Sequence, residues 1–308
     1  MTQAAAQSSA SAIADVIVVG AGPAGSSAAY HMATLGLDVI LLEKQELGRD
    51  KVCGDGLTPS AVRELVSMGV DTSGWQRNRG LRVIGGGHLL HFPWPEQASF
   101  PSYGMARPRA LLDRDLAEHA AAAGARLLTG VTVTGPVTSP TGRVTGVEAR
   151  PTNRVAYPGI EAPTTFTAPL VIDAGGVSAR LATAVGRTKN ERRPMGVAVR
   201  AYFRSPRAKD AWMESRLELW DGKPGKSDLL PGYGWIWSVG EGLVNVGLGS
   251  VSSRASATAI DYRAVFNRWM DNVPASWGFT KENQVGGLVS AALPMAFNRK
   301  PHYADGLM

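Results

Sequence analysis

A glycine-rich segment near the start of the chain has the residue types and the spacing that bind the phosphates of a dinucleotide. The segment is Gly20-Ala21-Gly22-Pro23-Ala24-Gly25, which matches G-x-G-x-x-G and directly follows a β-branched apolar run. The first glycine of this motif allows a tight turn, the second lets the backbone approach a pyrophosphate, and the third lets helix and strand pack closely. The phosphate then lies at a helix N-terminus, where free N–H groups favour an anion. A glycine-rich turn without a ligand is the alternative.

Two further strand ends carry residues that fit the rest of a dinucleotide. Glu43 follows the next apolar run, where a carboxylate accepts hydrogen bonds from an adenosine ribose, and Lys44 beside it is a further candidate. A solvated acid at a strand end is the alternative for Glu43. A second glycine-rich strand end contains Asp173 and Gly175, and two such ends suit a long ligand such as FAD. The sequence has no second strand-G-x-G-x-x-G-helix unit, and so no separate domain for a nicotinamide nucleotide. If FAD is bound, its electrons would come from NAD(P)H that binds transiently or from a reductant protein.

The elements that must position these residues follow from hydrophobic periodicity and from turn residues. The first three form a βαβ unit, with strands at 15–20 and 38–43 around a helix at 23–35. Later segments predict helices at 58–68, 108–123 and 261–270, and strands at 126–133, 143–149, 169–174, 232–237 and 244–249. The predicted fold class is α/β (α+β), a Rossmann-like domain with an interleaved, mostly antiparallel β domain.

Three segments beyond the nucleotide motif carry a family resemblance. They are Lys51-Val-Cys-Gly-Asp-Gly-Leu57, Arg109-Ala-Leu-Leu-Asp113, and Tyr233-Gly-Trp-Ile-Trp-Ser238 with Asn245-Val-Gly247 after it. With them the chain resembles the flavoprotein group that contains aromatic hydroxylases, and within it the geranylgeranyl reductase family, which includes mycobacterial-type menaquinone reductases. The resemblance covers about residues 14–308.

The resemblance implies roles for individual residues. Lys51, Cys53 and Gly54 match a K-x-C-G segment that lies beside the flavin ring in this family. Arg109 matches an arginine that contacts FAD, with Arg107 as the fallback. The candidate catalytic residues are Cys53, Tyr233 and Trp235, and the last two match a Y-x-W-x-F-P element that lines a prenyl-chain cavity. The sequence departs from that element at Trp237 and Ser238.

Plainer interpretations stand beside these roles. A single cysteine is most often a small buried apolar residue. Tyr233, Trp235 and Trp237 alternate, so a strand would turn all three to one face, and such a stripe usually belongs to a core.

The composition and the pattern of elements also predict a division of the chain. Residues 1–13 are expected to be a disordered tail, residues 14–79, 104–188 and 291–308 the FAD-binding domain, and residues 80–103 and 189–290 the substrate domain. The family continues after a segment like Gly306-Leu-Met308 into an L-V-G-D-A-A-G strand and a helix. We therefore expect a C-terminally truncated chain that retains FAD poorly.

Three functions follow from these observations. The first is an FAD-dependent oxidoreductase that reduces carbon–carbon double bonds of an isoprenoid chain, in menaquinone or a geranylgeranyl lipid, by hydride transfer from reduced flavin. The second is an FAD-dependent aromatic hydroxylase that uses NAD(P)H. The third is a truncated, flavin-poor and inactive form.

Composition and charge narrow the partners and the location. The net charge is +6, and residues 180–209 hold nine basic residues and one acid. This segment could rest on anionic lipid headgroups, although a solvated basic surface is the commoner outcome. One cysteine cannot form an internal disulfide, which fits the cytoplasm, with the inner face of the cell membrane as an alternative position. We expect no nucleic-acid partner and no metal site.

Overall fold

The computed structural model describes residues 13–52, 54–152, 162–187, 195–252, 260–294 and 302–308. The chain forms two compact units, each built from separated stretches of sequence. The first unit contains residues 1–49, 112–189 and 299–308, and the second contains residues 50–111 and 190–298.

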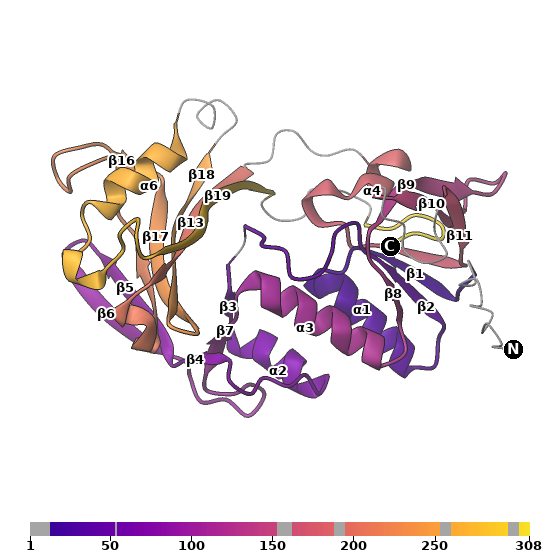
Figure 1. Ribbon diagram of the computed structural model, residues 1–308, viewed down its shortest axis with the longest axis horizontal. Coiled ribbons are helices and arrows are strands. Elements are labelled where there is room, and N and C mark those ends of the chain that lie inside the picture. Colours follow the sequence, from indigo (N-terminus) through magenta and orange to yellow (C-terminus); the bar gives the residue numbers. More distant parts are fainter. Residues whose placement is uncertain (1–12, 53, 153–161, 188–194, 253–259, 295–301) are drawn as a thin grey trace, which may run out of the picture. The chain divides into compact units, whose positions relative to one another are not determined.

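The first unit is built on a parallel sheet in the order β12-β1-β2-β8 (Figure 1). Every strand of this sheet is short and mainly apolar, as expected for strands that are covered on both faces. The predicted βαβ unit is confirmed, because a helix joins the first two strands. The bounds are β1 (Val16–Val19), α1 (Pro23–Thr34), β2 (Val39–Leu42), β8 (Arg126–Leu128) and β12 (Leu170–Asp173).

Alternate residues of the parallel sheet enter two different cores. Val16 and Val18 pack with Ala117 and Ala120 of helix α3 (Arg109–Ala122), which lies beside α1 in Figure 1. Ile17 enters the other core, which an antiparallel sheet in the order β11-β10-β9 helps to form. The remaining elements of this unit are β9 (Val131–Thr138), β10 (Val144–Pro151), β11 (Thr164–Thr167), η1 (Gly176–Ser178) and α4 (Arg180–Ala184).

One predicted strand of the first unit is wrong. Residues 126–133 form two strands that belong to different sheets, because the chain turns at Gly130 with a φ of 68°. Near the end of the chain, Leu307 forms a parallel bridge to Val171. The carbonyl of Met308 accepts a hydrogen bond from the N–H of Asp173 at 2.7 Å, so this segment lies along the outer side of β12.

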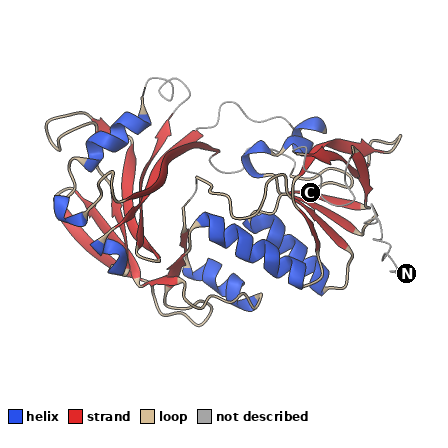
Figure 2. Ribbon diagram, in the orientation of Figure 1, coloured by secondary structure: helices blue, strands red, loops and turns tan. Residues whose placement is uncertain are grey.

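The second unit is built on a seven-stranded sheet in the order β19-β13-β18-β17-β14-β5-β6. Most neighbours in it are antiparallel, as predicted, and β14 with β5 is the parallel pair. Figure 2 shows that this unit is rich in strands. The bounds are β5 (Gly80–Gly85), β6 (His88–Pro93), β13 (Met195–Arg204), β14 (Trp212–Arg216), β17 (Gly232–Gly240), β18 (Leu243–Ser252) and β19 (Gln284–Pro294).

The two faces of this sheet have different residues. Helix α6 (Tyr262–Met270) begins at the side-chain cap of Asp261 and covers one face, where Val199, Ile236 and Val246 pack against its apolar side. The opposite face carries the next residues along each strand. Their register places three rows across β13, β18 and β17, namely Tyr202 with Asn245 and Trp237, Arg200 with Gly247 and Trp235, and Ala198 with Gly249 and Tyr233.

Several small elements complete the second unit. The strand Gly104–Ala106 packs through Ala106 against Tyr202 and Val239 of the large sheet. Residues 50–79 and 104–111, which the sequence analysis assigned to the FAD-binding domain, therefore lie in the second unit, as do residues 291–298. The elements are β3 (Gly56–Leu57), α2 (Pro59–Ser67), β4 (Gln76–Asn78), β7 (Gly104–Ala106), η2 (Pro206–Lys209), β15 (Leu219–Trp220), β16 (Leu229–Leu230) and η3 (Ala275–Trp277).

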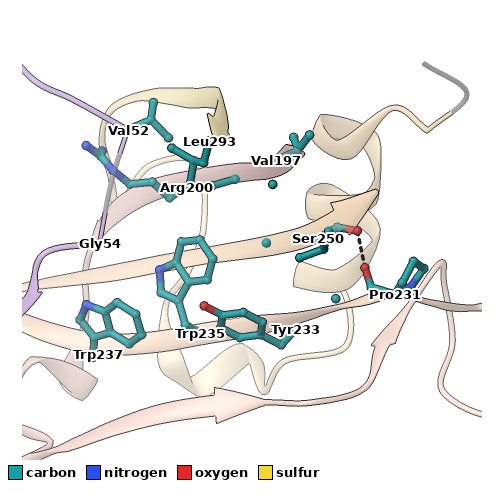
Figure 3. Close-up of a pocket in the computed structure, with 15 residues that line it drawn as sticks. Val52, Gly54, Val197, Arg200, Pro231, Tyr233, Trp235, Trp237, Ser250 and Leu293 are labelled. Atoms are coloured by element: carbon teal, nitrogen blue, oxygen red, sulfur yellow. Dashed lines mark hydrogen bonds between the residues drawn. The ribbon is translucent and has the colours of Figure 1, made fainter. Parts of the chain in front are cut away.

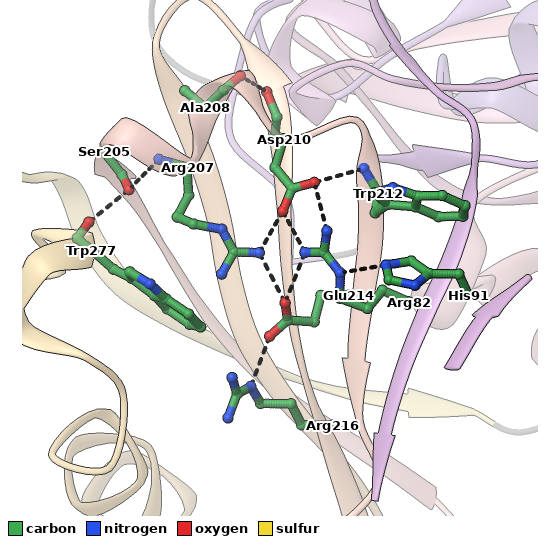
Figure 4. A network of polar contacts seen from close by, with 11 residues as sticks. Arg82, His91, Ser205, Arg207, Ala208, Asp210, Trp212, Glu214, Arg216 and Trp277 are labelled. Carbon is green, nitrogen blue, oxygen red and sulfur yellow. Dashed lines mark hydrogen bonds and ion pairs between the residues drawn. The ribbon is translucent and has the colours of Figure 1, made fainter. Parts of the chain in front are cut away.

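A network of ion pairs lies on the face that also carries α6 (Figure 4). Glu214 is only 2% exposed and accepts hydrogen bonds from Arg82, Arg207 and Arg216 at 3.2, 2.9 and 2.8 Å. Asp210 accepts from Arg82 and Arg207 as well. Burial opposes ionisation of Glu214, but the hydrogen bonds and charges of Arg207 and Arg216 outweigh burial and lower its pKa.

The network changes the interpretation of the basic segment 180–209. Arg207 is paired inside the second unit, and Arg200 is 1% exposed and pairs with Asp50. In the first unit, Arg187 donates to the carbonyl of Tyr303. Residues 188–194 lie outside the described part of the chain. Arg200 and Arg207 are therefore not surface charges available to lipid headgroups.

Candidate active site

The glycine-rich loop of the first unit has no room for a side chain at Gly20 or at Gly25. Gly20 has a φ of 102°, which disfavours other residues, and a Cβ there would lie 2.6 Å from the carbonyl oxygen of Ala174. A Cβ at Gly25 would lie 1.8 Å from the carbonyl oxygen of Gly20. No side chain caps the start of α1, whose N-cap is Gly22 and whose first residues are Pro23 and Ala24. The loop thus presents bare backbone and a helix N-terminus, as a pyrophosphate requires.

The acid after the second strand is held over this loop. Glu43 is buried, and its two carboxylate oxygens accept the N–H groups of Ala21 at 2.9 Å and Gln45 at 3.0 Å. Each oxygen keeps further acceptor capacity, so the predicted ribose contact fits this position. Lys44 points to solvent.

The second glycine-rich strand end adjoins the first. Asp173 is aligned with Val19 in the parallel pair of β1 and β12. Its carboxylate accepts the N–H groups of Gly175 at 3.1 Å and Ala182 at 3.0 Å. The carboxylate of Asp173 therefore fixes the turn that leads to α4, and Gly175 lies inside that turn.

The aromatic stripe of the second unit lines a pocket of about 360 Å³ (Figure 3). The rings of Tyr233, Trp235 and Trp237 all project from one face of β17, as the alternation predicted. Successive ring centroids are 5.9 and 5.7 Å apart, and the two indoles are stacked. Tyr233 is 44% exposed, so this stripe borders an accessible cavity instead of a closed core.

Glycines on the neighbouring strand make the space for these rings. Gly247 lies opposite Trp235 in the register of β18 and β17, and a Cβ at Gly247 would lie 2.3 Å from the indole. Trp235 also donates its Nε1–H to Asn245 at 2.8 Å. The indole therefore lies flat over β18, which explains why the Asn245-Val-Gly247 segment accompanies the aromatic strand.

Replacing Gly247 with alanine is expected to displace Trp235 and to lower the free energy of unfolding by about 1–3 kcal/mol, the usual cost of overpacking. Urea unfolding measures this change. Gly249→Ala is the matched control, since a Cβ there lies 3.3 Å from the same indole and should cost less. Equal stability of the Gly247 variant and the unaltered chain would contradict the role of Gly247 in making room for the indole.

The K-x-C-G segment lies at one end of this pocket. Val52 and Gly54 line the pocket, and the carbonyl of Lys51 accepts a hydrogen bond from Arg200 at 2.9 Å. Cys53 itself lies outside the described residues. Its predicted place beside the flavin ring stays a prediction.

The arginine that is predicted to contact FAD, Arg109, also lies in the second unit. The backbone N–H of Arg109 donates to Asp55 at 3.0 Å, and the Arg109 side chain is buried. Arg107, the fallback candidate, lies over the ring of Trp75 and 3.8 Å from Glu241.

Three polar residues at the site were not predicted from the sequence. Asp55 and Asn245 are completely buried and hydrogen-bonded to each other at 2.5 Å. Arg200 extends from β13 beside the pocket in Figure 3 and pairs with Asp50. Asp55 and Asn245 both lie in the segments that carry the family resemblance, which was the available signal for them.

Burial raises the pKa of two side chains at the site, those of Asp55 and Tyr202. It raises the pKa of Asp55 to about 6, although the hydrogen bond from Asn245 and the charge of Arg200 act in the opposite direction. Burial and the charge of Asp55 also raise the pKa of Tyr202.

Two structural features are absent from the described residues. Among them, no group of three or more His, Cys, Asp or Glu side chains is arranged to hold a metal ion. Within the same residues, no helix is both long enough and apolar enough to cross a membrane.

The glycine loop, its parallel sheet and the interleaved antiparallel unit define a class of flavoprotein. Residues 13–258 match the family model described as the FAD binding domain, and the chain belongs to that family.

The curated relatives belong to narrower classes of enzyme than the family model describes. The chain is 38% identical over 286 residues to the menaquinone reductase of Mycolicibacterium smegmatis. The alignment covers 92% of this chain and 65% of that protein. It is 30% identical over 256 residues to digeranylgeranylglycerophospholipid reductase 1 of Methanosphaera stadtmanae. That alignment covers 80% of this chain and 57% of that protein. The chain thus spans less than two thirds of the length of these relatives.

A solved structure has the same fold. It is a geranylgeranyl bacteriochlorophyll reductase-like protein from Thermoplasma acidophilum, which matches with a TM-score of 0.75 at 24% identity and covers 96% of this chain and 70% of that chain. The two curated relatives confirm the resemblance to the geranylgeranyl reductase family, and the solved structure confirms the predicted fold class.

Proposed function

We propose that the protein is an FAD-dependent oxidoreductase that reduces a carbon–carbon double bond of an isoprenoid chain, in menaquinone or in a geranylgeranyl lipid. The observation that carries this proposal is the aromatic pocket on the face of the sheet where the K-x-C-G segment lies. Its volume of about 360 Å³ falls in the usual range for small-molecule sites, about 300–1,000 Å³. Its wall of aromatic rings and glycines suits an apolar chain. The names of the curated relatives, which are reductases of menaquinone and of an isoprenoid lipid, support the same substrate class.

The residues of the first unit fit the dinucleotide part of FAD. Gly20, Gly22 and Gly25, with Pro23 and Ala24 between them, would hold the pyrophosphate. Glu43 would hold the ribose, with Lys44 nearby, and Asp173 and Gly175 would shape the adjoining turn. The fit rests on the two positions where a Cβ would strike backbone and on the buried Ser26 hydroxyl, which has no partner among the described residues.

Other proposed cofactor contacts belong to the second unit. They are Lys51, Cys53, Gly54 and Arg109. When bound and reduced, FAD would supply the hydride. NAD(P)H as a transient donor, or a reductant protein, belongs to the proposal as the source of electrons.

The aromatic wall would assist the chemical step. A prenyl double bond has no carbonyl group to accept charge, so positive character develops on the more substituted carbon as hydride arrives. The faces of Tyr233 and Trp235 would stabilise that charge by about 0.5–2 kcal/mol, the range of cation–π contacts. The required proton would come from Cys53 in its neutral form or from water.

The edge of the pocket suits entry of a lipid. Tyr233 and Val251 line the pocket and are also exposed. An isoprenoid chain could reach the rings from a membrane surface, so peripheral contact with the inner face of the membrane remains part of the proposal.

Incubation of the protein with FAD, dithionite and menaquinone tests this function. We expect a product that has gained two hydrogen atoms in its side chain, measured by mass spectrometry. The aromatic hydroxylase alternative predicts a product with an added oxygen atom when NAD(P)H and O₂ are supplied. The inactive alternative predicts no product and no flavin binding. Either of these outcomes would contradict the proposed reductase.

A further inference from the structure

The loop that carries the K-x-C-G segment is fixed by a buried carboxylate that the proposed chemistry does not use. Asp55 is fully buried. Its Oδ1 accepts the backbone N–H of Arg109 at 3.0 Å, and its Oδ2 accepts the side-chain N–H of Asn245 at 2.5 Å. Its carbonyl also accepts the backbone N–H of Arg107 at 3.0 Å. Both carboxylate oxygens therefore face N–H donors.

Asn245 extends this chain of hydrogen bonds to the pocket. An ionised carboxylate only accepts hydrogen bonds, and an indole N–H only donates one. The amide of Asn245 must therefore direct its nitrogen to Asp55 and its oxygen to Trp235, whose Nε1 lies 2.8 Å away. The chain of contacts runs from the loop through β18 to a ring that lines the pocket.

Arg200 holds the other end of the same loop. It is almost completely buried, pairs with Asp50 and donates to the carbonyl of Lys51. The loop is thus attached to the sheet at residues 50–51 and again at residue 55. Val52 and Gly54, between these attachments, line the pocket.

We propose that Asp55 is a positioning residue that sets the K-x-C-G loop and the Trp235 indole relative to each other through Asn245. The consequence for the reaction rests on the proposed function, because there the isoprenoid chain lies against Trp235. The coupling itself needs no substrate.

The geometry makes this coupling depend on ionisation of Asp55. A proton on Asp55 removes the negative charge that both N–H donors face, and a neutral acid is a weaker acceptor for the N–H groups of Arg109 and Asn245. The charged and titratable groups that face Asp55 are Arg200 and Tyr202 on β13, with Asp50 beyond Arg200. Arg107 and Arg109 contribute their backbone N–H groups. A weaker contact with Asp55 lets the Asn245 amide rotate more freely and loosens its hold on the indole of Trp235.

An NMR titration of the tryptophan indole N–H signals of the full chain tests the coupling. Trp235→Phe identifies the Trp235 signal by its absence. We expect this signal to shift with a midpoint near pH 6 in the unaltered protein and to stay constant in Asp55→Asn. Asp71→Asn is the control, because Asp71 is an exposed carboxylate on a turn of the same unit. A Trp235 signal that does not change between pH 5 and 8 in the unaltered protein would overturn the proposal, and this outcome needs no variant of Asp55 to fold.

Binding of farnesol, followed by tryptophan fluorescence, tests the consequence for the pocket. We expect affinity to fall about fivefold as the pH is lowered through 6, the value of one hydrogen bond of about 1 kcal/mol. The pH dependence should vanish in Trp235→Phe, which keeps a ring and loses the donor. An unchanged pH profile in that variant would refute the positioning role. Absence of farnesol binding at every pH, with a titrating indole signal, would instead contradict the proposed function and leave the coupling supported.

Discussion

Replacing Gly25 with alanine is expected to lower the affinity for FAD at least about a hundredfold, a loss of about 3 kcal/mol. The added Cβ would lie 1.8 Å from the carbonyl oxygen of Gly20 and 3.1 Å from the Cβ of Ala174. Neither contact can be relieved by a side-chain rotation, because the first involves the backbone of the phosphate loop. Helix α1 must therefore move away from β1, and its N-terminal N–H groups move with it.

The measurement is a titration with FAD followed by quenching of flavin fluorescence, at a temperature where circular dichroism shows the variant to be folded. Gly36→Ala is the matched control, since Gly36 has a φ of 83° and no atom within 4 Å of an added Cβ. The control carries backbone strain without a clash at the loop, so it should bind FAD as the unaltered protein does. Unchanged FAD affinity in the Gly25 variant would show that the loop does not hold the pyrophosphate.

The local part of this site was predictable from sequence because each feature lies within one βαβ unit. The glycines, the helix start and Glu43 are near neighbours along the chain. Alternation also predicted that Tyr233, Trp235 and Trp237 share one face, since side chains of a strand alternate. The pocket confirms that they do.

The pairing of the buried polar residues was not predictable, because their partners are distant in sequence. Asp55 and Asn245 are 190 residues apart, and Arg200 and Asp50 are 150 apart. A charge count placed Arg200 in a basic segment facing solvent, because nothing near it in sequence indicates a buried partner. Only the register of β13 with β18 brings Arg200 to the pocket face.

The expected domain boundary differs from the boundary between the two compact units. The contacts that decide it also join residues that are distant in sequence. Residues 80–84 pair in parallel with residues 212–216, and residue 106 packs on residues 202 and 239. These long-range contacts hold 50–111 in the second unit. The wrong prediction of one strand at 126–133 has a local cause instead, because Gly130 is a turn residue that could have been recognised in the sequence.

Replacing Glu214 with alanine is expected to lower the free energy of unfolding by about 3–5 kcal/mol, the cost of removing one partner from a buried ion pair. The variant would leave three guanidinium groups near one remaining carboxylate, that of Asp210. Arg216 would lose its contact with Glu214 and retain the ring of Trp277, 5.2 Å away. The three guanidinium groups left behind are only 14–24% exposed, so water replaces the lost partner incompletely and the uncompensated charge is costly.

Urea unfolding at pH 7 measures this loss. Asp221→Ala is the matched control, because Asp221 forms an ion pair with Arg268 in which both side chains are exposed. Such a pair contributes about 0–1 kcal/mol. A Glu214 variant no less stable than the Asp221 variant would mean that the network does not stabilise the sheet.

The same network predicts how stability depends on acid. The pKa values of Glu214 and Asp210 are lowered in the folded protein, against burial, by the arginines around them. Their unfolded values are near 4.5 and 3.8, so the stabilisation is present above these values and is lost as the pH falls through the lower folded ones. The unaltered protein should therefore lose more stability than Glu214→Ala between pH 5 and 3. Parallel stability curves for the two proteins over this range would contradict the assignment of Glu214 as the ionised centre of the network.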